Sequence, residues 1–555
     1  MPVRASGPTD AKIAFVGMGP AKEEMATGVP FMGPSGQIFN KALSTLGRSR
    51  REVYVTNIHD EYLQAGTSLF SLPGDVLQRS LARCKRELEL VKPNVVVPLG
   101  DEPLYFLTGQ HGITKWRGSI LQSTMVPGLK CVPTIHTAWI LRGMWKWLPV
   151  FTHIDLKRAF EEAASPDIKL PERNAITGPS YNTVMDFINE CEKHEYLSMD
   201  IETFGWSPQG MGEIACLGIG YEPNSALCIP ITKSGSIPYW GEREESKIWQ
   251  AYARLVQNPR IKKIGQNLSF EWIYHWYHRV FPANMYVDTM LLHHTLYPDW
   301  GATQDPYQTK RRDDEPGHSL AFINSHYTRT PYYKEDGKQR GPGVGDYAFW
   351  TYNCKDVMVT MDAAFAMMTE AQEEKAWDIY RDYHMETFPS VMRAEHYGVL
   401  IDMERRREAG VELASEIVRL QDQINQKLGY DLNVQSPKQM HDLLYNRLRF
   451  KPKMKKVKTP HGVVLRPTAD KDALRELTET SQNPILVWIQ ELRAARDLKS
   501  DIVDQPLGSD NRMHTHWKQG GTDSNRWSST KSILGTGMNF QNVPVRGIAR
   551  KLFIP

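Results

Sequence analysis

Short hydrophobic runs alternate with amphipathic stretches in the first part of the chain. Apolar runs at residues 11–16, 53–57 and 94–99 have the length of buried strands, and residues 77–91 have the charge and periodicity of a helix. Alternation of strands with helices is typical of an α/β domain with a mainly parallel sheet. The pattern therefore predicts a first α/β domain over residues 1–165.

A second α/β pattern begins after a proline-rich, polar stretch, residues 166–180, which we interpret as a linker. The predicted domain covers residues 181–377, and its apolar runs predict strands near 197–202, 215–221 and 226–231. Within it, residues 299–346 are rich in glycine, proline and charge around an apolar patch at residues 320–323. This composition predicts an exposed, mobile insertion.

The remainder, residues 378–555, has a helical pattern. Asp402 is placed to cap the start of a long amphipathic helix and Gly429 to end it. The apolar positions of this helix recur every three or four residues, at Leu413, Ile417, Leu420, Ile424 and Leu428. A second amphipathic helix is predicted at residues 485–503, and the two together suggest an antiparallel pair. The predicted fold class is therefore multidomain α/β and α+β.

Composition narrows the classes of protein. A length of 555 residues allows three or four domains of about 150 residues each. With 41% hydrophobic and 24% charged residues, the chain is not a disordered or fibrous protein. No apolar run approaches the roughly 20 residues that span a membrane. Six cysteines without a CxxC pair argue against a disulfide framework or a zinc site, so we expect a cytoplasmic protein. With 67 basic and 64 acidic residues the chain has almost no net charge, so nucleic-acid contacts must come from local basic patches.

Two acids lie two residues apart in an apolar strand of the second domain. Asp200 and Glu202 must point to the same face of that strand. Two like charges on one face repel each other unless a cation lies between them, and hard cations such as Mg²⁺ prefer carboxylate oxygen. An edge strand with a solvated acidic face is the alternative interpretation.

Two later segments favour the cation site. Glu271 opens a predicted helix directly after a strand, and Tyr352 and Asp356 share one face of another helix at a spacing of four residues. Four acids and a tyrosine from separate segments suit phosphodiester hydrolysis assisted by two metal ions, Mg²⁺ or Mn²⁺.

These segments, in this order, resemble the three motifs of DnaQ-like 3′–5′ exonucleases, above all those of family A DNA polymerases. The resemblance implies an RNase H-like fold. It also implies that Asp200 bridges two ions, that Asp356 binds the ion on the nucleophile side and that Glu271 serves the second ion. Glu202 and Tyr352 would orient the attacking water. The family has aspartate where this chain has Glu271, and the longer side chain could weaken activity or shift the ion.

The third part carries a basic segment and two family-like motifs. Residues 449–458 hold six basic residues and no acid, and Lys455 and Lys456 among them are candidate phosphate contacts. A solvated surface loop is the alternative. The segments 522–530 and 538–546 resemble motifs that contact primer–template DNA in family A polymerases. By this resemblance the part is a helical thumb with the start of a palm, and its DNA-binding candidates are Arg526, Gln541, Asn542 and Arg546.

The family's next motif, which supplies the first polymerase carboxylate, is not present. Polymerisation depends on carboxylate-held metal ions, so we expect that this chain alone does not polymerise. Either it is truncated, or a second polypeptide supplies the rest of the palm and the fingers, as in a split, phage-type polymerase. Two other hypotheses stay open: a stand-alone 3′–5′ exonuclease, and an inactive DNA-binding scaffold.

The first domain resembles family-4 uracil-DNA glycosylases through segments at residues 11–20, 28–37, 53–57 and 136–139. A flipped base in such enzymes stacks on a phenylalanine, is read by an asparagine and is stabilised by a histidine. The matching positions are Phe31, Asn57 and His136.

Several positions of the first domain depart from that family. Met18 replaces an acidic residue, and Ala21 replaces a glycine. The four cysteines that hold the family's iron–sulfur cluster are reduced to Cys84, and Glu61 stands at another ligand position, so no cluster is expected. We therefore expect a DNA-binding or architectural role for this domain, with uracil excision as the alternative.

Overall fold

The computed structural model of the chain describes residues 2–64, 66–204, 212–234, 236–300, 317–338, 345–459, 462–532, 537–544 and 547–554. The chain divides into two compact units. The first comprises residues 1–206, 212–389 and 519–526, and the second comprises residues 207–211, 390–518 and 527–555. Within the described residues, no helix combines the length and the hydrophobicity that a membrane crossing requires.

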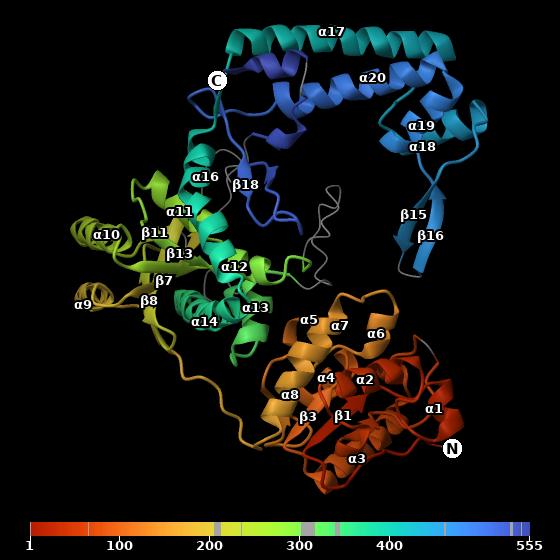
Figure 1. Cartoon of the computed structure of the whole chain (residues 1–555), viewed down its shortest axis with the longest axis vertical. Helices are drawn as coiled ribbons and strands as arrows, with labels where there is room; N and C mark the ends of the chain where they lie inside the picture. The colour runs from red at the N-terminus through yellow and green to blue at the C-terminus, as the bar shows by residue number, and fades with distance from the viewer. Residues whose placement is uncertain are drawn as a thin grey trace. The chain divides into compact units, whose positions relative to one another are not determined.

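The first domain is built on a five-stranded sheet in the order β2-β1-β3-β5-β4; Figure 1 labels its neighbouring strands β1 and β3. The strands are β1 Ile13–Gly17, β2 Tyr54–Asn57, β3 Val95–Pro98, β4 Leu121–Gln122 and β5 Lys130–Cys131. All pairs are parallel except β4 with β5, which confirms the predicted, mainly parallel sheet.

Two hydrophobic clusters lie in this first domain. The larger includes Phe15, Phe39 and Trp147, and the other includes Val16, Cys84 and Leu88. The main helices are α2 Pro34–Thr45, α3 Gly74–Val91, α4 Asp101–Thr108 and α8 Lys157–Glu162. Because apolar side chains of β1 enter both clusters, we infer that both faces of the sheet are buried.

The second domain contains a six-stranded sheet in the order β13-β12-β7-β8-β9-β6. Its strands are β6 Asn174–Ile176, β7 Tyr196–Phe204, β8 Glu213–Glu222, β9 Ser225–Pro230, β12 Lys262–Gly265 and β13 Met285–Asp288. The long helix α14, Asp346–Glu373, contacts β7, β8 and β9. Its other helices include α9 Tyr181–Cys191, α10 Glu242–Val256, α11 Leu268–Tyr277 and α12 Thr289–Leu296.

Two predictions for this region were wrong in part. The stretch interpreted as a linker contains β6, which pairs in parallel with β9 and extends the sheet. The apolar patch in the predicted insertion forms helix α13, Leu320–Tyr327, in which Phe322 and Ile323 are buried. The polar residues around the patch suggested an exposed segment, whereas its apolar side chains are packed. Residues 301–316 and 339–344 of that insertion lie outside the described residues.

Two long helices, α17 Met403–Leu428 and α20 Pro484–Leu498, dominate the third part and pack on each other (Figure 1). The capping of α17 is as predicted, since the Asp402 carboxylate accepts from the backbone N–H groups of Glu404 and Arg405, and Gly429 ends the helix with φ 76°. Further helices are α16 Glu386–Tyr397, α18 Pro437–His441 and α19 Lys471–Ser481.

Short strands complete this part. The strands β17 Arg512–Met513, β14 Val399–Ile401 and β20 Phe553–Ile554 form one small sheet in that order. The basic segment predicted as a loop is largely a strand: β15 Met454–Thr459 pairs antiparallel with β16 Gly462–Pro467. Lys455, Lys456 and Lys458 make up half of β15, so composition alone suggested a loop.

Candidate functional site

Strand β7 places two carboxylates on one face of the second sheet. Asp200 pairs with Gly218 of β8 and Glu202 pairs with Cys216, so both lie in the middle of a paired strand. The alternative of a solvated edge strand is therefore wrong, because β7 has β8 on one side and β12 on the other. Helix α14 packs across this sheet and brings Asp356 to the same place.

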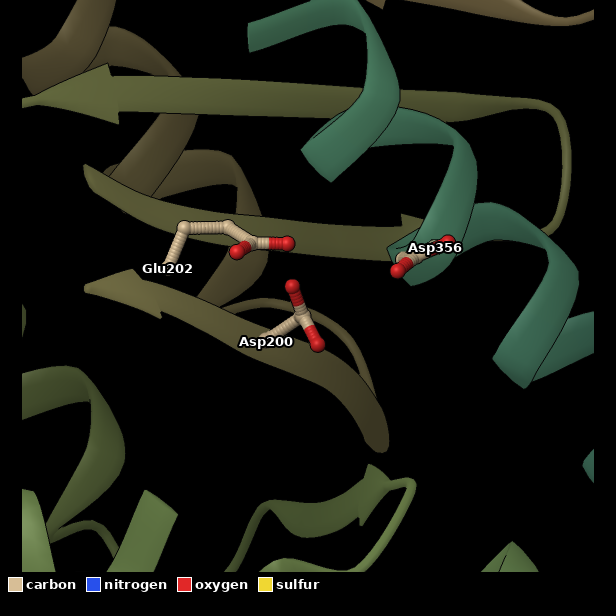
Figure 2. Close-up of side chains that lie close together, drawn as sticks. All are labelled: Asp200, Glu202 and Asp356. Carbon is tan, nitrogen blue, oxygen red and sulfur yellow. The ribbon is translucent and has the colours of Figure 1, made fainter. Parts of the chain in front are cut away.

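The three acids converge. One carboxylate oxygen each of Asp200, Glu202 and Asp356 lies within 4.8 Å of the other two, and within the described residues this is the sole group of three or more potential ligands that meets this limit. Figure 2 shows the three carboxylates directed toward a shared space from β7 and α14. Burial raises the pKa of Asp200 well above its usual value, and the charges of Asp356 and Glu202 raise it further. Such mutual repulsion is relieved by a hard cation, so the donor set fits Mg²⁺ or a similar ion.

Neighbouring side chains fix the carboxylates. The Asn353 amide donates to Oδ2 of Asp200 at 2.7 Å. The Tyr333 hydroxyl donates to Oδ1 of Asp356 at 2.7 Å, and the Lys334 ammonium lies 2.6 Å from both oxygens of that carboxylate. Asp356 is thus oriented by the segment that precedes α14 as well as by its own helix.

Tyr352 lies one helical turn before Asp356 and beside the same ammonium. Its hydroxyl accepts from Nζ of Lys334 at 3.0 Å. Burial, then the nearby carboxylates, raise the pKa of Tyr352. The phenol is therefore protonated at neutral pH and can donate a hydrogen bond to a water or a phosphate oxygen.

Glu271 lies in the first turn of α11 and is buried, but it does not belong to the group of three. Burial raises the pKa of Glu271, and the charges of Asp288 and Glu202 add to the effect. Its Oε2 has no hydrogen-bond partner within the described structure. A buried carboxylate oxygen without a donor is costly, so this side chain is consistent with a cation ligand.

Asp288 orders the loop that carries Glu271. Its carboxylate accepts from the backbone N–H groups of Asn267 at 3.0 Å and Leu268 at 2.8 Å, and it also caps α12. Burial raises the pKa of Asp288 to about 6, although four backbone donors, those of Asn267, Leu268, Met290 and Leu291, act in the opposite direction. These contacts indicate that Asp288 stabilises the N-terminus of α11.

The first domain gathers the three residues singled out as a base pocket. The rings of Phe31 and His136 are 5.7 Å apart. A Cβ atom added to Gly17 would lie 2.4 Å from Oδ1 of Asn57 and 2.7 Å from the Phe31 ring, so both side chains approach this glycine. Phe31 has φ 58°, a strained conformation of the kind that clusters at functional sites.

The protonation state of His136 follows from its surroundings. The backbone N–H of Ala138 donates to Nδ1 of His136 at 3.0 Å, which leaves the proton of the neutral ring on Nε2. Burial lowers the pKa of His136 to about 4. The ring is therefore neutral at pH 7 and can donate from Nε2 to a developing oxyanion.

The departures from the glycosylase pattern are also visible. Met18 packs against the smaller hydrophobic cluster, and Cys84 is fully buried within that cluster. Glu61 is exposed to solvent. Burial in this apolar cluster raises the pKa of Cys84 to about 12, so its surroundings favour the thiol over a metal-binding thiolate.

The DNA-binding candidates of the third part come from three segments of the sequence. Arg526, Gln541 and Asn542 are exposed, and the Gln541 amide donates to the carbonyl of Trp527 at 2.7 Å. Lys455 is exposed on β15 and pairs with Asp470 at 3.0 Å. Lys456 lies on the same strand with its side chain outside the description, and Arg546 lies outside the described residues altogether.

Three family descriptions match successive parts of the chain. Residues 5–163 match the uracil DNA glycosylase superfamily, residues 180–370 a 3′–5′ exonuclease family and residues 403–555 DNA polymerase family A. A type-4 uracil-DNA glycosylase of Thermotoga maritima is 31% identical over 160 residues, which are 28% of this chain and 80% of that protein. A DNA polymerase I of Borreliella burgdorferi is 26% identical over 372 residues, which are 65% of this chain and 36% of that protein.

The chain belongs to the uracil-DNA glycosylase superfamily through its first domain, while residues 180–370 match a 3′–5′ exonuclease family and residues 403–555 match DNA polymerase family A. It spans 36% of the length of the Borreliella burgdorferi polymerase. A solved structure described as the POL domain of Pol1 from M. smegmatis, in complex with DNA primer-template and dNTP, is 19% identical with a TM-score of 0.49, over 68% of this chain and 57% of that one.

Sequence reasoning missed several residues of the exonuclease domain. It assigned no role to Asn353, Tyr333 or Lys334, although all three contact an acid of the cluster. Asn353 could have been inferred, because it lies three residues before Asp356 on the same helix and so near the same face. Tyr333 and Lys334 carry no local signal, since only the packing of their segment on α14 places them in the family's exonuclease site.

Proposed function

We propose that the exonuclease domain removes nucleotides from the 3′ end of DNA with Mg²⁺ or Mn²⁺. The observation that carries this proposal is the convergence of Asp200, Glu202 and Asp356 within 4.8 Å, in the part of the chain that matches a 3′–5′ exonuclease family. In a family A DNA polymerase such an activity would serve proofreading during DNA replication.

Each residue has a proposed task. The divalent ions would activate water and stabilise the leaving oxygen. Asp200, held by Asn353, would be the ligand shared by two ions, while Asp356 would hold the ion on the water side and Glu271 would serve the other. Glu202 and the protonated phenol of Tyr352 would orient the water, one as acceptor and one as donor.

The reaction has a defined polarity that can be measured. Single-stranded DNA labelled at the 3′ end should lose its label as a mononucleotide at the first step, whereas a 5′ label should shorten one nucleotide at a time. EDTA should stop both processes, and Mg²⁺ or Mn²⁺ should restore them. Internal cleavage, or digestion from the 5′ end, would contradict the proposal.

Polymerisation is a separate proposal. The polymerase family match supports a grip on primer–template duplex through Arg526, Gln541, Asn542, Arg546, Lys455 and Lys456. A second polypeptide that carries the rest of the palm and the fingers remains a prediction, as does a location in the cytoplasm. Primer extension by the chain, with and without such a polypeptide, measures whether it is needed.

For the first domain we propose recognition of uracil in DNA, favoured by the assembly of Phe31, Asn57 and the neutral His136 around Gly17. Met18 supplies no carboxylate for water activation, so excision should be slow. Slow release of uracil from single-stranded DNA, without an initial burst, would support a residual glycosylase. This release should be lost in His136→Ala. If the domain binds DNA equally well with and without uracil, its role is general DNA binding.

A further inference from the structure

The segment that brings Lys334 to the exonuclease site also contacts the glycosylase-like domain. This segment, residues 331–338, will be called the bridging segment, and it precedes α14 in the chain. Both domains belong to one compact unit. The bridging segment is therefore a direct physical connection between two sites to which separate activities are assigned.

On the exonuclease side the bridging segment lies tightly against α14. Lys355 of α14 pairs with Asp336 at 2.8 Å. A Cβ atom added to Gly337 would lie 2.8 Å from the ring of Tyr352, so the backbone here runs directly over that ring. The Nζ of Lys334 lies 4.8 Å from the centre of the same ring.

On the other side the segment is held by residues around helix α5, Ile113–Trp116, of the glycosylase-like domain. The backbone N–H of Tyr332 donates to the hydroxyl of Ser119 at 3.2 Å, and the Tyr332 ring meets Trp116 edge to face at 5.4 Å. Lys115 pairs with Glu335 at 2.7 Å. Residues on both sides of Lys334 are thus anchored to the first domain.

The anchoring continues into buried structure. Arg117 is 1% exposed, forms an ion pair with Asp155 at 2.7 Å and donates to the Ser325 hydroxyl at 2.8 Å. Arg158 donates to the backbone carbonyl of His326 at 2.8 Å. Because detaching α13 would leave these buried guanidinium groups without two of their hydrogen-bond partners, which is costly, helix α13 is held in place on the first domain.

The consequence concerns the charge at the carboxylate cluster. The Lys334 ammonium contacts both oxygens of Asp356 and is largely buried, with 19% of its side chain exposed. A divalent cation bound to Asp356 would compete with this ammonium for the carboxylate oxygens and meet its repulsion at short range. Lys334 therefore stabilises the cluster without metal and opposes binding of the metal.

We propose that Lys334 is a positioning residue that lowers the cation affinity of the exonuclease site, and that the glycosylase-like domain holds it there through Trp116, Lys115 and Ser119. The inference rests on the proposed exonuclease function. Its consequence is that a change in the first domain alters metal binding in the second, with no DNA present.

The first experiment measures Mn²⁺ affinity of the full-length chain by electron paramagnetic resonance titration. Lys334→Met keeps the length and removes the charge, and it should raise the affinity by about tenfold. Lys193→Met, at an exposed lysine of the same domain, is the matched control and should leave it unchanged. An affinity of Lys334→Met that equals or falls below that of the wild type would overturn the proposal.

The second experiment tests the route through the first domain. Trp116→Ala should raise the Mn²⁺ affinity, by about threefold, and should have no further effect in the Lys334→Met background, since coupled residues are not additive. Lys115→Ala, at the surface, should act in the same direction if Trp116→Ala does not fold. Affinities at the wild-type value in both variants would overturn the role of the glycosylase-like domain.

A further variant separates this inference from the function on which it rests. Asp200→Asn should lose the Mn²⁺ site altogether. If it does so while Lys334→Met behaves as the wild type, the exonuclease site stands and the inference about Lys334 fails. If Asp200→Asn binds Mn²⁺ as the wild type does, the proposed function itself fails.

Discussion

At the scale of single residues, the exonuclease domain concentrates negative charge where water is scarce. Glu271 is 3% exposed and shares the neighbourhood of Asp288 and Glu202, and burial raises its pKa. A carboxyl group with a raised pKa takes up a proton on folding, so the folded state without metal binds more protons than the unfolded one above pH about 4. The contribution of Glu271 to the stability of the metal-free protein therefore falls as pH rises from that value through its folded-state pKa.

Glu271→Gln tests this charge directly. The amide is isosteric and cannot ionise, so in EDTA the variant should be more stable than the wild type at pH 8, and the difference should shrink toward pH 5. Thermal unfolding at both pH values measures it, with exposed Glu190→Gln as the control. Exonuclease activity in Mg²⁺ should fall in the same variant. A variant that is less stable at pH 8 would show that the carboxylate is held by partners rather than by a cation.

Sequence patterns identified the acidic residues but not the side chains that contact and orient them. Asp200 and Glu202 could be placed on one face because a strand repeats every two residues, and Tyr352 and Asp356 because a helix repeats every three to four. Lys334 and Tyr333 could not be foreseen, because their contacts with Asp356 depend on how a connecting segment folds over α14. Local periodicity carries no information on such packing.

At the scale of elements, long periodic segments were predictable and short ones were not. The strands β7, β8 and β9 and the helix α17 were recognised from their hydrophobic patterns and caps. The strand β6 has only three residues and gains its structure by pairing with β9. The lysines of β15 made the β15–β16 hairpin hard to predict from the sequence. Its strands are stabilised by cross-strand partners rather than by neighbours in sequence.

The pair formed by α17 and α20 allows a quantitative prediction. Leu492 of α20 is fully buried in a hydrophobic cluster that also contains Leu420 of α17. Leu492→Ala should lower the free energy of unfolding of this part by about 2–5 kcal/mol, because it removes apolar contacts and leaves a cavity. Hydrogen exchange of α17 and α20 in the full-length chain measures the loss. Val418→Ala, at a side chain that is 59% exposed, should change it by less than about 0.5 kcal/mol.

At the scale of the whole molecule, three domains of different ancestry contribute different chemistry to one chain. In the first, the side chains of Phe31 and Asn57 approach Gly17; in the second, three carboxylates converge; the third matches DNA polymerase family A. Family matches assign each part, whereas only the structure shows that the bridging segment joins the first two. The proposed effect of the first domain on the carboxylate cluster thus depends on the packed unit and on no single motif.

The central claim is that Asp200 lies at the centre of a metal-dependent 3′–5′ exonuclease site. The most direct test compares Asp200→Ala with Asp186→Asn, a change at an exposed acid of the same domain, in single-turnover release of a labelled 3′ nucleotide from single-stranded DNA in Mg²⁺. Loss of the shared ligand should lower the rate by about a thousandfold, a loss of about 4 kcal/mol of transition-state stabilisation, while Asp186→Asn should match the wild type. Release at the wild-type rate by Asp200→Ala would contradict the account.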